Sequence, residues 1–267
     1  MDSSTPTATS DWQTTQDPKP LVAVVFTHND AATIERCLTS VAECTAAIWV
    51  VDTGSTDNTL TLARQWASQV MHEPAAGDPW TLWQRVLNAL KTHYPQEAWI
   101  IWLEPTDWLP TQSQQTLERW IRLESQTAQQ TGQTHWKLPL HLHHWNGTPL
   151  HWGGWRHHDL RLGLLNHLNP DDHPLYCGWV SHPATPSNTS IPSLHSVVIH
   201  HQSSHANAVR QHSHAWQQAY QTHQYLQGQR ALLPHITHTV GIWFRQWVQQ
   251  LGVLNGPEGI DWFSQHI

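Results

Sequence analysis

The stretch that decides the fold reads LVAVVFTHND over residues 21–30 and resumes as IWVVDTGSTDNT over residues 48–59. Its opening run, residues 21–26, is apolar and rich in β-branched side chains, which suits a parallel strand covered on both faces. Between the two parts, apolar residues recur at helical spacing: Ile34, Leu38 and Val41. The pattern therefore predicts a strand, a helix and a second buried strand at residues 48–51, joined as a right-handed crossover.

The second strand leaves a carboxylate, Asp52, at its carboxyl end. Gly54 then permits a tight turn, Ser55 or Thr56 can cap the next helix, and Asp57 falls in the first turn of that helix. In open α/β sheets, ligands bind at the carboxyl ends of the strands. The other interpretation is an ordinary βαβ unit in which Asp52 only caps a turn.

Three segments of the chain resemble the family 2 glycosyltransferases, which have the GT-A fold. Residues 52–59 resemble the D-x-G-S-x-D-x-T segment of that family, and residues 27–30 look like its first nucleotide-contacting loop. Residues 99–109 are similar to the strand and acidic turn that carry the metal-binding D-x-D. The resemblance implies an α/β fold of GT-A type, with a Rossmann-like mixed sheet flanked by helices.

Later segments are similar to those of a bacterial subgroup that works on lipopolysaccharide cores and related glycans. In order along the chain they are an R-L segment, a G-x-x-H-E-like segment, a hydrophobic-plus-His segment and a C-terminal glycine-rich segment, at residues 160–162, 177–182, 197–201 and 251–260. The resemblance therefore covers roughly residues 21–262.

The resemblance implies an inverting enzyme that transfers a sugar from a nucleotide-sugar donor, a UDP-sugar above others, to a glycan or lipid-linked acceptor. Asp52 is the expected nucleoside contact. The expected nucleotide-binding set is Thr27, Asn29, Asp30, Asp52, Gly54 and Ser55. A rival interpretation is a catalytically impaired GT-A-fold binding or scaffold protein, because Thr106 and Pro183 stand where the family has acids.

The metal-binding turn departs from the family pattern. When residues 103–107 are laid on L-D-x-D-(D/E), Glu104 replaces the first acid, Thr106 the second, and Asp107 is the third. A threonine hydroxyl is a weaker ligand for a hard cation than a carboxylate. Glu104 and Asp107 can still bind one Mg²⁺ or Mn²⁺ with waters and phosphate oxygens, or they only cap the turn after the strand.

Two residues are candidates for the catalytic base. His182 matches the His of the family's H-E pair, and an imidazole has a suitable ordinary pKa. However, Pro183 stands in the place of the acid that would orient it. Asp159 is the second candidate.

The composition is rich in two ring residues, with 23 His and 18 Trp among 267 residues. His141 and His143 would share one face of a strand, as paired zinc ligands often do. About two H-x-H pairs are expected by chance at this frequency, and the chain has two, so composition alone explains the pattern. Four tryptophans of the acceptor half either stack on a sugar or pack in the core: Trp145, Trp152, Trp155 and Trp179.

Charge and hydropathy exclude several classes of partner. A net charge of −7 with 13 basic residues argues against a nucleic-acid-binding surface. No apolar run approaches the roughly 20 residues that span a bilayer. The cysteines show no C-x-x-C spacing, and Cys37 and Cys44 fall two turns apart on the first predicted helix, so we expect a core-facing pair in a reducing cytoplasm.

The chain divides into three predicted parts. Residues 1–20 form a flexible tail, residues 21–230 one domain, and residues 231–267 a C-terminal helical extension. The domain holds a nucleotide-binding half up to residue 110 and an acceptor half from residue 111. A helix near residues 239–251 has one apolar face, which either packs on the domain or makes peripheral contact with the inner face of the membrane. Further elements are predicted as helices at 60–67, 83–90, 111–134 and 205–227, and as strands at 69–72 and 99–103.

Overall fold

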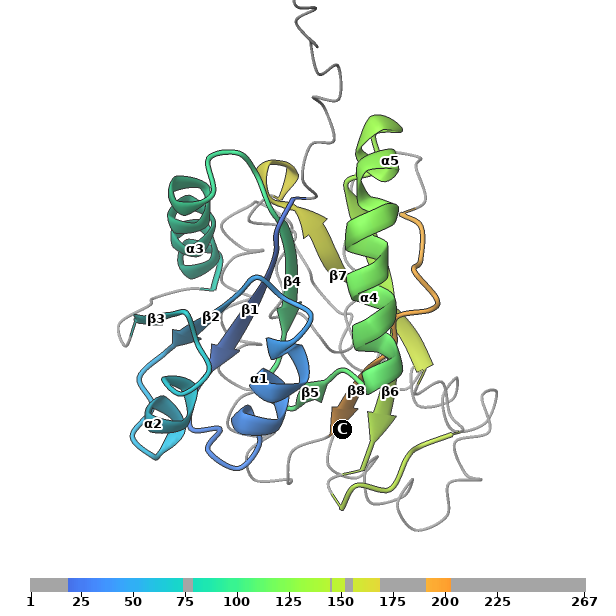
Figure 1. Cartoon of the computed structure of the whole chain (residues 1–267). Coiled ribbons are helices and arrows are strands. Elements are labelled where there is room, and N and C mark those ends of the chain that lie inside the picture. The colour runs from blue at the N-terminus through green and yellow to red at the C-terminus, as the bar shows by residue number, and fades with distance from the viewer. Residues whose placement is uncertain (1–18, 74–78, 145, 152–155, 169–190, 203–267) are drawn as a thin grey trace, which may run out of the picture.

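The computed structural model describes residues 19–73, 79–144, 146–151, 156–168 and 191–202. They form an α/β fold in which helices cover both faces of one mixed sheet (Figure 1), as the sequence predicts. The strands are β1 Leu21–Thr27, β2 Ala47–Asp52, β3 Gln69–His72, β4 Trp99–Leu103, β5 Asp107–Trp108, β6 His135–His143, β7 Arg156–Leu164 and β8 Ile199–Gln202. The helices are α1 Ile34–Ala42, α2 Thr59–Ala63, α3 Pro79–His93, α4 Thr111–Leu123, α5 Ser125–Gln130 and the 3₁₀ helix η1 Leu165–His167.

The described strands lie in the order β3-β2-β1-β4-β7-β6-β8-β5. β1 pairs in parallel with both β2 and β4, and β2 pairs in parallel with β3, so these four strands end at one edge. We call this edge the carboxyl edge. β7 is antiparallel to β4 and carries the sheet on into β6 and β8. Strands from both predicted halves therefore share one sheet, while the predicted extension 231–267 lies outside the described residues.

Alternating residues of β1 pack into two separate cores. One face, with Ala23 and Val25, packs against α1 and α4, and the other face, with Val22 and Val24, packs against α3. Because β1 is buried on both faces, its near-continuous apolar sequence is required in this position. The strand therefore lies between two helical layers.

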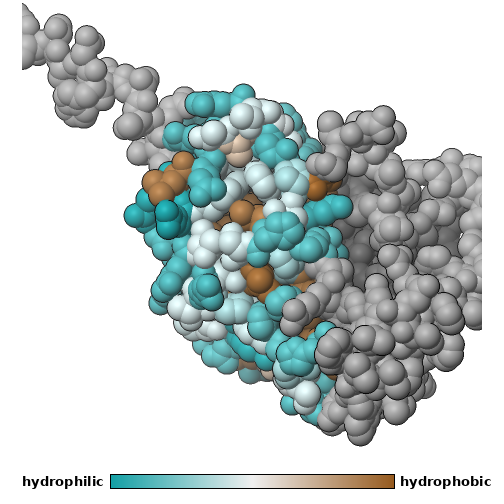
Figure 2. Space-filling model, turned by 90° about the vertical axis from the view of Figure 1, so that its right-hand side faces the viewer, coloured by the Kyte–Doolittle hydropathy of each residue, from teal (hydrophilic) through white to brown (hydrophobic). Residues whose placement is uncertain are grey.

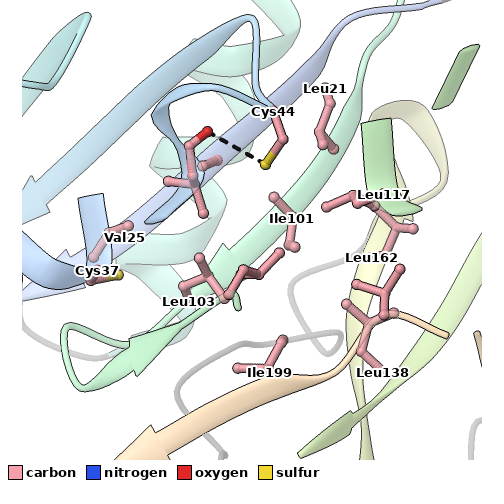
Figure 3. Packing of buried hydrophobic residues seen from close by; sticks show 14 of the residues in the cluster. Leu21, Val25, Cys37, Cys44, Ile101, Leu103, Leu117, Leu138, Leu162 and Ile199 are labelled. Carbon is pink, nitrogen blue, oxygen red and sulfur yellow. Dashed lines mark hydrogen bonds between the residues drawn. The ribbon is translucent and has the colours of Figure 1, made fainter. Parts of the chain in front are cut away.

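The first core contains both described cysteines as free thiols (Figure 3). Cys37 lies on α1, whereas Cys44 lies beyond the end of that helix and donates to the carbonyl of Val41 at 3.6 Å. The expected core-facing pair is confirmed, but the helix between the two cysteines is shorter than the spacing indicates. Burial raises the pKa of Cys44 to about 12, so this thiol stays protonated.

Two predicted helices differ from the observed ones. The helix expected at 60–67 is α2, which ends at Ala63 and continues as a tighter turn, in which the amide of Trp66 donates to Ala63. The helix expected at 111–134 is divided into α4 and α5 at Glu124. In the part of the chain that the structure describes, no helix is long and apolar enough to cross a membrane.

A hollow of about 450 Å³ lies beside α4 and α5, on the side of the molecule that Figure 2 views. Trp120, Leu123 and Trp136 contribute its apolar surface, and Leu123 is 61% exposed. In Figure 1 the strand arrows of β1 and β4 point away from α5, so this hollow and the carboxyl edge lie at opposite ends of the sheet.

Candidate functional site

Two loops interlock where β1 and β2 end at the carboxyl edge. Thr27 and Asp52, the last residues of these strands, are partners in the register of the sheet. The first loop, residues 27–30, folds on itself, because Asp30 accepts hydrogen bonds from the Thr27 hydroxyl and the His28 amide, both at 2.8 Å. The Asp30 amide in turn donates to the Thr59 hydroxyl at 2.8 Å.

Asn29 fastens the first loop to the second loop, residues 52–57. Its side-chain oxygen accepts from the amides of Thr56 at 2.8 Å and Asp57 at 3.3 Å, and its own amide donates to the Ser55 hydroxyl at 2.9 Å. Asn29 has a φ of 58°, a left-handed conformation that asparagine tolerates better than most residues. The sequence-predicted nucleotide-binding residues are therefore neighbours in the structure.

Asp52 is fully buried, and its carboxylate closes the second loop. Its oxygens accept from the amide of Gly54 at 3.1 Å and of Ser55 at 3.1 and 3.2 Å. Gly54 has a φ of 103°, which explains the glycine in this turn. Burial acts to raise the pKa of the Asp52 carboxyl, but hydrogen bonds from Ser55, Gly54 and His72 outweigh it and hold the pKa below its ordinary value.

His72 is a site residue that the sequence analysis missed. It is the last residue of β3 and the partner of Asp52 in the sheet register. Its Nδ1 lies 2.8 Å from Asp52 Oδ2, and its side chain is 51% exposed beside the fully buried carboxylate. The sequence could have indicated His72, because it is the last residue of the strand predicted at 69–72 and parallel strands end at one edge of a sheet.

A second polar centre lies where β4 and β7 meet. Trp136 of β6 pairs with Leu162, and the next residue, Lys137, pairs with Leu160, so Arg161 is the extra residue of a β-bulge. Such bulges re-aim side chains within a sheet. The Arg161 side chain is fully buried, and its guanidinium lies 3.2 Å from Asp107, 3.5 Å from Glu104 and 3.7 Å from Asp159.

Asp107 is enclosed by partners on both carboxylate oxygens. Oδ1 lies 2.7 Å from Nδ1 of His201, and Oδ2 accepts from Arg161 and from the amide of Glu104. Burial acts to raise the pKa of Asp107, but Arg161 and His201 lower it below the ordinary value. Burial likewise acts to lower the pKa of His201, and the hydrogen bond to Asp107 raises it. The pair is a buried ionic contact between β5 and β8.

The donor set around Glu104 and Asp107 does not fit a divalent cation held by both carboxylates. The Asp107 side chain has no exposed surface, and its oxygens are used by Arg161, His201 and the Glu104 amide. Among the described residues, no group of three or more His, Cys, Asp or Glu side chains is arranged to hold a metal ion. The cationic partner of Asp107 is supplied by the protein itself.

The two base candidates have different outcomes. Asp159 lies on β7, with its side chain 23% exposed, in the same ionic cluster as Glu104 and Arg161. His182 lies outside the described residues. So do all four tryptophans that were expected either to stack on a sugar or to pack in the core: Trp145, Trp152, Trp155 and Trp179. Of the two base candidates, Asp159 is therefore the one that the structure describes.

Histidines of β6 and β8 form a cluster on the sheet face opposite His201. Nε2 of His143 lies 2.8 Å from Nδ1 of His200, and the two rings stack. His141 and His143 share one face of β6, as the sequence predicts, and His200 is the register partner of His141. Burial, followed by His143 and His141, lowers the pKa of His200 to about 4.

Comparison with solved structures finds partial matches. TarS from S. aureus is 18% identical, with 48% of this chain and 22% of that chain covered and a TM-score of 0.34. Glucosyl-3-phosphoglycerate synthase from Mycobacterium tuberculosis, in complex with Mn²⁺, uridine diphosphate and glucosyl-3-phosphoglycerate, is 17% identical. That match covers 47% of this chain and 44% of that chain, with a TM-score of 0.33. The matched part thus spans less than half the length of either protein.

Comparison with curated proteins finds no match. Comparison with protein-family models finds one match, which extends from the second residue of β1 to just beyond β3. It includes both interlocked loops and His72, but not the Arg161 centre. The stretch of this chain that builds the carboxyl edge of β1, β2 and β3, residues 22–76, matches the family described as Glycosyl transferase family 2.

Proposed function

We propose that this chain is a glycosyltransferase that moves a sugar from a UDP-sugar to a hydroxyl group of a glycan or lipid-linked acceptor, with inversion. One observation carries the proposal. The interlocked loops at the carboxyl edge, with Asn29 and Asp52 at their centre, fall within the stretch that matches Glycosyl transferase family 2. Ligand sites of open α/β sheets occupy this position.

The reaction needs a base at the acceptor and stabilisation of the leaving diphosphate. In an inverting transfer the acceptor oxygen bonds to the anomeric carbon, the bond from that carbon to the phosphate oxygen breaks, and the base takes the hydroxyl proton. Asp159 is our candidate, because its partly exposed carboxylate lies beside the second polar centre, 3.7 Å from the Arg161 guanidinium. His182 stays an alternative from the sequence.

A second candidate function is a catalytically impaired GT-A-fold protein that binds a nucleotide sugar and serves as a scaffold. The observation in its favour is the enclosed Asp107, which is paired with Arg161 and His201 in the turn where the family resemblance expects a metal ligand. Thr106, 7% exposed, stands between the two acids of that turn.

Calorimetric titration with UDP, CDP, GDP and ADP, with and without Mn²⁺, tests nucleotide binding. Release of UDP from a panel of UDP-sugars, with glycan acceptors present, tests transfer. UDP binding with turnover supports the transferase. UDP binding without turnover of any UDP-sugar supports the scaffold, and a folded protein that binds no nucleoside diphosphate contradicts both.

Asp52→Asn is the first variant to test. The substitution replaces one carboxylate oxygen with a donor, so the Gly54 and Ser55 amides and His72 lose part of their acceptor. We expect UDP binding to weaken by at least ~1 kcal/mol, the scale of one charge-assisted hydrogen bond. Asp57→Asn, in the same loop at a carboxylate that accepts from the Thr59 amide, is the control for general loop damage.

The proposal includes peripheral contact with the inner face of the membrane, through the apolar face predicted near residues 239–251 in the sequence. Co-sedimentation with liposomes compares the full chain with a chain that ends at residue 234. Loss of co-sedimentation on truncation supports the contact. Equal behaviour of two folded proteins contradicts it.

A further inference from the structure

The two side chains of the Asp52–His72 pair differ in their exposure to solvent. The Asp52 side chain has no exposed surface, whereas 51% of the His72 side chain is exposed at the end of β3. A ligand at this edge can therefore reach the imidazole without disturbing the second loop, but it cannot reach the carboxylate in the same way.

The carboxylate is also chemically occupied. Its oxygens accept from the amides of Gly54 and Ser55, and Oδ2 also lies 2.8 Å from Nδ1 of His72. Its pKa lies below the ordinary value, so the group is ionised and cannot donate a hydrogen bond to the imidazole. Nδ1 of His72 must therefore carry the hydrogen that is shared with Asp52.

This hydrogen bond fixes the chemistry of the other ring nitrogen. In a neutral imidazole with the hydrogen on Nδ1, Nε2 holds a lone pair and is an acceptor. Among the residues that the structure describes, none forms a hydrogen bond with Nε2 of His72. With the hydrogen on Nδ1 directed at Asp52, the neutral form of His72 presents Nε2 as a half-exposed acceptor at the carboxyl edge.

We propose that His72 is a specificity-determining residue that reads the nucleobase of the donor, by accepting a hydrogen bond from a ring N–H. The inference rests on the proposed function. Uracil carries such a donor at N3, whereas N3 of cytosine is a lone-pair acceptor that Nε2 would face without a proton between them. Asp52 acts through His72, as a positioning residue that fixes the tautomer.

The test uses the full chain and three diphosphates: UDP, N3-methyl-UDP, which differs from UDP only at N3, and CDP, which lacks the N3 hydrogen and has an amino group at C4. Wild-type protein binds UDP about tenfold more tightly than the other two, the scale of one hydrogen bond. His72→Ala binds UDP about tenfold more weakly than wild type and binds all three within about twofold of each other. His167→Gln, an exposed histidine of η1, keeps the wild-type preference.

The outcomes separate the inference from the proposed function. Wild-type protein that binds UDP and N3-methyl-UDP equally overturns the role of His72 and leaves the transferase proposal standing, and this measurement needs no variant to fold. Protein that binds no nucleoside diphosphate removes the proposed function and the inference together. A His72→Ala variant that is folded by circular dichroism and still prefers UDP to N3-methyl-UDP assigns the discrimination to another residue and also overturns the inference.

Discussion

Arg161 shows how a single residue fixes the architecture of the second polar centre. Its guanidinium is fully buried and lies within 3.7 Å of three carboxylates, those of Glu104, Asp107 and Asp159. A buried charge is tolerated only when it is paired, and removal of one partner leaves the other uncompensated. Asp107 would then be a fully buried carboxylate with His201 as its remaining cationic partner.

We predict that Arg161→Met destabilises the fold by about 3–5 kcal/mol, the usual cost of breaking a buried ion pair. Methionine keeps most of the side-chain volume, so lost packing contributes little. Arg122→Met removes an exposed pair with Glu118 and should change stability by less than about 1 kcal/mol. Urea unfolding measures both variants. A loss at Arg161 no larger than the loss at Arg122 would contradict the pairing.

The sequence predicted the interlocked loops around Asp52 better than the second polar centre around Arg161. Asn29 and Asp52 were expected together, because the ends of neighbouring parallel strands meet at one edge. Arg161 appeared in the sequence only as part of a resemblance, without a role, because a β-bulge is a property of pairing between β6 and β7 and leaves no local pattern. The role of His201 was missed for a different reason, because its contact with Asp107 joins residues far apart in the chain.

At the scale of elements, the bounds of the strands were predicted better than the bounds of the helices. The strands expected at 69–72 and 99–103 have those bounds in the structure. The helix expected at 111–134 is divided, and the Ser125 hydroxyl, buried at the division, donates to the carbonyl of Ile121. Serine competes with helical backbone bonding in this way, and the apolar spacing of the helix does not report it.

The histidines that join β6 and β8 should make the fold less stable in acid. Burial lowers the pKa of His143, and burial together with neighbouring histidines lowers the pKa of His200 to about 4. The unfolded chain binds protons at these histidines near the ordinary value of about 6.5, where the folded chain does not. Stability is therefore lost as the pH falls from about 6.5 toward about 4.

His200→Gln should flatten this part of the stability profile, because the glutamine binds no proton in either state. His167→Gln, an exposed position, should leave the slope as it is in wild type. Urea unfolding at a series of pH values gives both slopes. The Trp108 ring contacts His143 and His200, and Arg36 lies 4.0 Å from the centre of that ring. Arg36 stays charged over this pH range, so it adds nothing to the change of stability with pH.

At the scale of the whole molecule, β1 holds both polar centres at one edge of the sheet. The Asp52–His72 pair lies on the β2 side of β1, and Glu104 follows β4 on the other side. Cys37 of α1 packs at this edge, with its thiol 3.2 Å from the carbonyl of Glu104. A nucleoside bound beside His72 would thus direct its diphosphate along the edge toward Glu104 and Asp159, where we place the transfer.

The last prediction concerns metal dependence of the folded chain with its nucleotide. Binding to the native state alone at about 100 times Kd adds about 2.7 kcal/mol to the unfolding free energy. Because Asp107 is already paired with Arg161 and His201, we expect UDP to give this stabilisation in EDTA as well as in Mn²⁺. Thr106→Asp restores a carboxylate to the turn and should make the stabilisation larger in Mn²⁺ than in EDTA, whereas Thr106→Asn, of equal size and neutral, should not. Wild-type protein that UDP stabilises only in Mn²⁺ would show that a metal ion, rather than Arg161, completes this centre.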